Sequence, residues 1–150
     1  MDLRTYAKLV REVARAAGPL SEQGNRQLKI NGKPFRLRPD EHFVYPHGHL
    51  LVEYELNRRP VESISKYWWL LCRSDWLENG QRIALVIMLL DSAVNDIRAE
   101  SVELLGHELE KRYPEAFSFF YAPPDGMTAS QIRQVASQAV VRVKSNVPWP

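Results

Sequence analysis

The sequence has a single cysteine, no long apolar run and little net charge, and each shortage excludes a class of protein. One cysteine, Cys72, excludes an internal disulfide, and because it lies in an apolar helical run we expect it to be a buried small hydrophobe. No apolar run reaches the ~18 residues that a membrane span needs. The net charge of +2 does not by itself require a nucleic-acid partner, so any basic surface must be local.

Several functional signatures are also missing. The first residues lack the apolar core of a signal peptide, so we expect a cytoplasmic protein with no membrane partner. There is no phosphate-cradling glycine loop, no nucleophile elbow and no His-Glu-x-x-His zinc motif. What remains is a chain of 150 residues, 45% hydrophobic and 25% charged, which is typical of one globular domain spanning residues 1–150.

Apolar periodicity and turn residues predict an α/β protein. The expected helices span residues 3–17, 60–77, 96 or 98 to 112, and 129–144. A three-stranded meander is expected over 27–56, with strands at 82–90 and 117–121, and residues 21–25 are expected to form a loop. Because residues 82–90 are apolar on both faces, that strand should be central. We therefore predict a mixed sheet with helices on both faces.

The segment from Asp40 to Glu55 carries the most informative pattern. If His47 and Gly48 form a two-residue turn, Asp40 pairs with Glu55 and His42 with Glu53. Alternation then places Asp40, His42, Glu53 and Glu55 on one face of the sheet. Carboxylates gathered in this way repel each other unless a cation lies between them, and Mg²⁺ prefers such oxygen ligands. A shift of pairing by one residue would move Asp40 to the other face.

A basic stripe on the first helix is the second informative pattern. Arg4, Lys8, Arg11 and Arg15 recur at spacings of four, three and four residues, which is the geometry of a helix that faces phosphates. A solvated helix face explains the same spacing, and both interpretations stay open. A basic pair, Arg58 and Arg59, precedes the second helix, whose first residue is expected to be Pro60.

The order α-βββ-α-β, with Pro39-Asp40 followed by Glu53-Tyr54-Glu55, resembles the PD-(D/E)XK nuclease superfamily, which is restriction-endonuclease-like in fold. It is closer still to proteins of the replication-relaxation type from mobile elements, because Arg58-Arg59 and Lys66-Tyr67 follow. The resemblance implies that Asp40 and Glu53 bind Mg²⁺. It gives Glu55 one of two roles: it completes the acidic pair, or it stands where the motif has lysine, with Lys66 supplying that cation from the helix.

The resemblance implies a Mg²⁺-dependent nuclease-like protein that acts on DNA, and it leaves a homodimer open. The alternatives are a nuclease fold without catalysis that grips DNA through the first helix and Arg58-Arg59, and a protein-interaction domain without nucleic acid. A zinc site at His47 and His49 is disfavoured, because His47 lies in the expected turn and no fourth ligand is evident. We expect Trp68 and Trp69 to be core and rim aromatics rather than base-stacking platforms.

Overall fold

The structure is a computed structural model, and it describes residues 2–30, 32–55, 60–73, 81–90, 97–122 and 127–144. The four helices in these ranges are α1 (Leu3–Ala16), α2 (Pro60–Cys72), α3 (Ile97–Arg112) and α4 (Ala129–Lys144). The strands are β1 (Ser21–Glu22), β2 (Lys29–Ile30), β3 (Lys33–Pro34), β4 (Glu41–Tyr45), β5 (Gly48–Glu55), β6 (Arg82–Leu89) and β7 (Phe117–Ala122).

The helices begin where their capping residues predict. The Asp2 side chain accepts a hydrogen bond from the Thr5 amide at 2.9 Å, which caps α1. At α4, Thr128 Oγ1 accepts from the Gln131 amide at 3.2 Å, and Gln131 Oε1 accepts from the Thr128 amide at 2.8 Å. This reciprocal pair is a capping box, so the predicted start of the last helix is confirmed.

Five strands form one mixed sheet in the order β1-β4-β5-β6-β7. The pairs β1–β4 and β4–β5 are antiparallel, whereas β5, β6 and β7 run parallel. The predicted central strand is confirmed: β6 lies between β5 and β7, and from Ile83 to Leu89 its residues are buried. A mixed sheet in an α/β fold is therefore confirmed.

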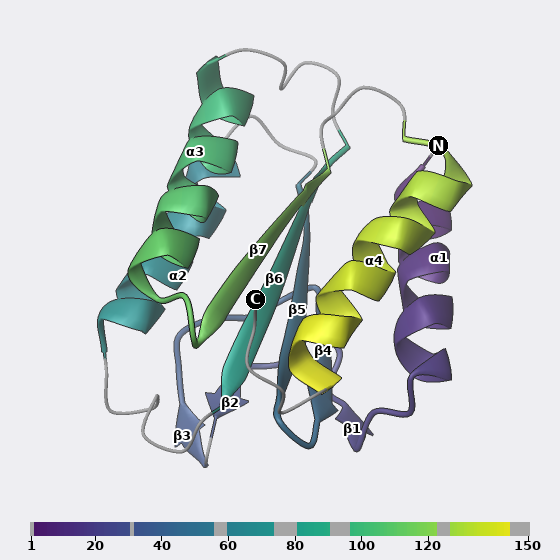
Figure 1. Cartoon of the computed structure of the whole chain (residues 1–150), viewed down its shortest axis with the longest axis horizontal. Coiled ribbons are helices and arrows are strands. Elements are labelled where there is room, and N and C mark those ends of the chain that lie inside the picture. Colours follow the sequence, from purple (N-terminus) through teal and green to yellow (C-terminus); the bar gives the residue numbers. More distant parts are fainter. Residues whose placement is uncertain are drawn as a thin grey trace.

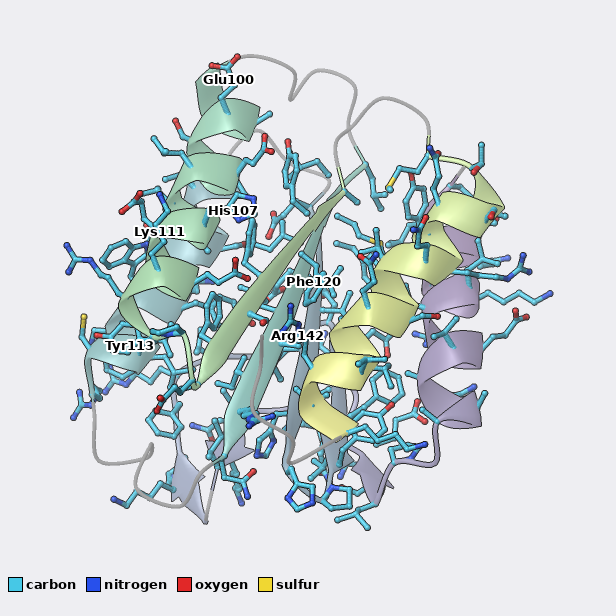
Figure 2. The ribbon with its side chains drawn as sticks, in the orientation of Figure 1. Glu100, His107, Lys111, Tyr113, Phe120 and Arg142 are labelled. Atoms are coloured by element: carbon cyan, nitrogen blue, oxygen red, sulfur yellow. The ribbon has the colours of Figure 1, made fainter. Side chains whose placement is uncertain are left out.

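Two helices cover each face of this sheet, as Figure 1 shows. On one side α2 and α3 pack over a core that includes Leu51, Ile64, Leu85 and Phe117. On the other side α1 and α4 pack over a second core, and Figure 2 shows Phe120 of β7 lying toward α4 on that side. The helices on both faces were predicted. The sheet separates the two cores, because alternate side chains of each strand point to opposite faces.

The β4–β5 hairpin has the predicted faces but a different register. Tyr45 pairs with Gly48 and Glu41 with Val52, so the turn consists of Pro46 and His47 rather than His47 and Gly48. The predicted pairing of Asp40 with Glu55 is therefore wrong: continuing the observed register by one step puts Asp40 opposite Glu53. Because the error is two residues, every side chain keeps its predicted face.

Three smaller expectations are corrected. Residues 21–22, expected within a loop, form β1 on the edge of the sheet against β4. The β2–β3 hairpin pairs only with itself, so it is not a strand of the main sheet. Cys72 is exposed at the end of α2, with its sulfur 3.9 Å from the Tyr113 hydroxyl just beyond α3 (Figure 2 labels Tyr113). Among the described residues no helix is long and apolar enough to cross a membrane.

The close approach of α3 to β7 gives a first prediction. A Cβ added at Gly106 would lie 2.3 Å from the Phe119 ring. Glycine to alanine normally stabilises a helix by ~1 kcal/mol, but overpacking against a buried ring costs ~1–3 kcal/mol. We expect Gly106→Ala to lower the free energy of unfolding in urea. The exposed Leu104→Ala on the same helix is the control and should change it by less than ~0.5 kcal/mol. A stabilised Gly106→Ala protein would contradict this packing.

Candidate active site

The four residues predicted to be catalytic lie together where β5 ends and α2 passes over the sheet. Asp40 directly precedes β4, and its Oδ2 accepts a hydrogen bond from the Tyr54 backbone amide at 2.8 Å. Glu53 and Glu55 alternate with Tyr54 on β5, so they share the face that α2 covers. Lys66 lies on α2 and interacts electrostatically with both glutamates. The structure thus brings Asp40, Glu53, Glu55 and Lys66 into one cluster.

Two side chains of α2 hold the glutamates in place. The Tyr67 hydroxyl donates to Glu53 Oε1 at 2.7 Å, and the Ser63 hydroxyl donates to Glu55 Oε1. Ser63 and Tyr67 are four residues apart, so they lie on the same face of the helix. Both are buried. The helix therefore supplies a polar donor to each carboxylate from within its otherwise apolar inner face.

Burial is the main influence on the charge state of these glutamates. It raises the pKa of Glu53 to about 8; the nearby Asp40 and Glu55 add to the rise, while the Tyr67 hydrogen bond and Lys66 oppose it. Burial also raises the pKa of Glu55, with Asp40 again adding and the Ser63 hydrogen bond opposing. Near neutral pH Glu53 is therefore largely protonated unless a cation stabilises its charged form.

Carboxylate oxygens such as those of the three acids are the ligands that a hard divalent cation prefers. Asp40, Glu53 and Glu55 each have one oxygen held by a protein donor, and their second oxygens have no hydrogen-bond partner among the described residues. Metal-binding carboxylates are commonly held in this way by an outer layer of donors. In the described ranges, however, no three acidic, histidine or cysteine side chains are arranged so that they could hold a metal ion. A cation would have to draw the second oxygens toward a common point.

The basic stripe of α1 lies on the other side of the sheet, and half of it is engaged in ion pairs. Arg11 contacts Glu41 at 2.6 Å and Arg15 contacts Glu22 at 2.7 Å, whereas Arg4 and Lys8 are exposed. This arrangement gives Arg11 and Arg15 roles in tying α1 to β4 and β1. Of the predicted DNA-binding residues, Arg58 and Arg59 lie outside the described residues.

A pair of buried histidines lies nearer the other end of the same hairpin. His42 Nε2 and His49 Nδ1 are 2.9 Å apart, so one ring donates and the other accepts. Burial lowers the pKa of each to about 4, which keeps both rings neutral at physiological pH. His49 therefore pairs with His42 rather than with His47.

Sequence reasoning missed the two donors on α2. The hydroxyls of Ser63 and Tyr67 were not predicted to bond Glu55 and Glu53. The signal was their spacing of four residues on a helix whose inner face also carries Ile64, because this places two hydroxyls against the strand that ends in Glu53 and Glu55.

No protein-family model, no curated protein and no solved structure matches this chain.

The ion pair between α1 and β4 gives a prediction that tests whether Arg11 stabilises the fold rather than serving only to bind DNA. Glu41 is only 2% exposed, so Arg11→Met would leave a buried carboxylate without its partner. We expect a loss of ~1–3 kcal/mol in the free energy of unfolding at pH 7. The control Arg15→Met breaks a more exposed pair and should cost less than ~1 kcal/mol. Equal, small effects in urea titrations would contradict a structural role for Arg11.

The raised pKa of Glu53 predicts how stability depends on pH. The folded protein keeps a proton on Glu53 up to pH about 8, whereas the unfolded chain releases it near 4.5. The native state therefore binds more protons in that window, so stability falls as pH rises through it. His42 and His49 act in the opposite direction, but only below pH 6.5, where the unfolded chain becomes protonated.

The window between pH 6.5 and 8.5 separates the titration of Glu53 from that of the two histidines. In EDTA, we expect the free energy of unfolding to fall there by on the order of 1–2 kcal/mol. Glu53→Gln should remove most of this fall, while Glu103→Gln, an exposed substitution on α3, should not. Parallel pH profiles for wild type and Glu53→Gln would show that Glu53 is not a half-buried, perturbed acid.

Proposed function

We propose that this chain is a Mg²⁺-dependent, nuclease-like protein of restriction-endonuclease-like architecture that hydrolyses phosphodiester bonds in DNA. The observation that carries the proposal is Glu53, a half-buried carboxylate whose pKa is raised to about 8 and which lies beside Glu55, Asp40 and Lys66. A carboxylate held in this state is stabilised by a cation. Perturbed acids grouped with a lysine are more typical of a functional site than of a structural one.

The order of the elements also supports the proposal. After α1, the strands β1, β4 and β5 form three antiparallel neighbours, with β2 and β3 as a separate hairpin between the first two. The helix α2 then leads to β6, which is parallel to β5. This is compatible with the α-βββ-α-β order of PD-(D/E)XK nucleases. Asp40 and Glu53 stand where that motif has its acidic residues.

Each residue of the cluster has a chemical role in this proposal. Asp40, Glu53 and Glu55 would hold Mg²⁺, which when bound polarises a phosphoryl oxygen and lowers the pKa of an attacking water. The ammonium of Lys66 stabilises negative charge that develops on the phosphoryl group. Tyr67 and Ser63 orient Glu53 and Glu55 by holding one oxygen of each. Exposed Arg4 and Lys8 add positive charge on the outer surface of α1.

One observation favours a second candidate, a catalytically inactive nuclease fold that binds DNA. Glu55 stands where the motif has lysine, and its carboxylate is already satisfied in part by Ser63. In this version the carboxylate cluster is a remnant, and Lys66 contacts phosphate without assisting cleavage. The two candidates differ in whether the metal and Lys66 change a reaction rate.

Substitutions in the cluster separate these candidates. Glu53→Gln keeps the shape and removes the charge, so it should abolish cleavage of supercoiled plasmid or single-stranded DNA in Mg²⁺ or Mn²⁺. Lys66→Met should leave metal binding intact but slow cleavage by about 10²-fold, since it removes only the cation near the developing charge. Binding of Mg²⁺ should raise the melting temperature of wild type and of Lys66→Met by mass action.

Glu103→Gln on α3 is the matched control and should cleave and melt like wild type. If wild type neither cleaves nor melts at a higher temperature with either metal, the nuclease proposal fails. Metal-independent DNA binding would then favour the inactive fold, and no binding at low salt would favour a protein-interaction domain.

A further inference from the structure

A basic groove crosses the surface between α2 and the β2–β3 hairpin. It consists of two hollows of about 490 and 410 Å³, which adjoin each other because Arg36 and Trp69 line both. The first extends to Lys33 and Arg73, and the second extends to Lys66. Since Lys66 also interacts with Glu53 and Glu55, this end of the groove adjoins the candidate active site.

The groove is positively charged along its length. Its cationic lining residues are Lys33, Arg36, Lys66 and Arg73, and no carboxylate is among the described residues that line it. Arg36 forms no salt bridge within the described ranges, and Lys66 forms none there but interacts electrostatically with Glu53 and Glu55. A chain with a net charge of only +2 has therefore gathered cations in one groove. This favours a polyanion as occupant.

An exposed aromatic side chain lies among these cationic residues. Trp69 is 44% exposed, and the Arg73 guanidinium lies over its ring at 4.7 Å from the centroid. Lys66 and Trp69 lie three residues apart on α2, and Arg73 directly follows the last residue of that helix. The prediction that Trp68 and Trp69 are core and rim aromatics agrees with this arrangement, since Trp68 packs against the core and Trp69 is exposed.

We propose that the α2–hairpin groove binds single-stranded nucleic acid and guides the strand to the carboxylate cluster. Arg36, Lys66 and Arg73 contact backbone phosphates, and an unpaired base stacks on the Trp69–Arg73 platform. Alternating cations and aromatic surface are the means by which proteins grip single strands. A duplex has its base faces stacked and cannot offer one to Trp69. The path of the strand toward the carboxylate cluster rests on the proposed function, whereas binding of a single strand to the groove is tested separately.

The test is fluorescence anisotropy with the full chain in EDTA, so that binding is measured without cleavage. The probes are labelled oligothymidylate, oligouridylate and a duplex of equal length. We expect either single strand to bind more tightly than the duplex. Trp69→Leu should weaken single-strand binding about tenfold, and Trp69→Phe should retain most of it because stacking survives.

Charge variants test the phosphate contacts. Arg36→Gln with Arg73→Gln should reduce the salt slope of log K by about 1.4, since each phosphate contact to a single strand contributes about 0.7. The control removes two exposed cations from α4, on the other side of the sheet, by Arg133→Gln with Lys144→Gln, and should bind like wild type.

Three results would overturn the proposal that the groove binds single strands. They are equal affinity for the duplex, wild-type affinity of the Trp69→Leu protein, and a loss of affinity in the α4 control variant as large as that in the Arg36→Gln, Arg73→Gln variant. Groove-dependent binding without metal-dependent cleavage would refute only the nuclease. If the protein cleaves DNA but the groove substitutions leave its single-strand affinity unchanged, only the proposal that the groove binds the strand is refuted.

Discussion

Antiparallel pairing of β4 with β5 decides which side chains meet each layer of helices. With Glu41 opposite Val52, alternation sends Phe43, Leu50 and Val52 toward α1 and α4. The same alternation sends Asp40, Glu53 and Glu55 toward α2. A slip of one residue would turn the carboxylates into the α1–α4 core and the apolar side chains toward α2 and α3, so the fold and the candidate site depend on one register.

Placing carboxylates beneath a helix costs free energy, and the protein offsets only part of that cost. Tyr67 and Ser63 donate to Glu53 and Glu55, yet burial still raises both pKa values. The Arg11–Glu41 pair on the other side of the sheet shows how a buried acid is neutralised when it serves structure. Glu53 has no such arginine among the described residues, which is the contrast that motivates a cation-binding role.

Local signals predicted the elements well, because capping residues, apolar alternation and the apolar run of β6 are properties of short segments. The faces of β4 and β5 were also correct, since a two-residue error in the turn preserves alternation. The pairing of Ser21–Glu22 with β4 was not predictable, because it depends on where α1 packs. Exposure of Cys72 was missed, since an apolar helix of uncertain length does not reveal which face its last turns present to solvent. The hydroxyl donors to the carboxylates became visible only once α2 was placed over β5.

The central claim is that a divalent cation binds Asp40, Glu53 and Glu55 and stabilises the charged form of Glu53. The most direct test is NMR titration of the glutamate side-chain carboxyl carbons, with and without Mg²⁺. The account predicts that Glu53 titrates near pH 8 in EDTA and at clearly lower pH in Mg²⁺, because a bound cation favours the charged form. Titration of Glu53 near 4.5, or an elevated pKa that Mg²⁺ leaves unchanged, would contradict it.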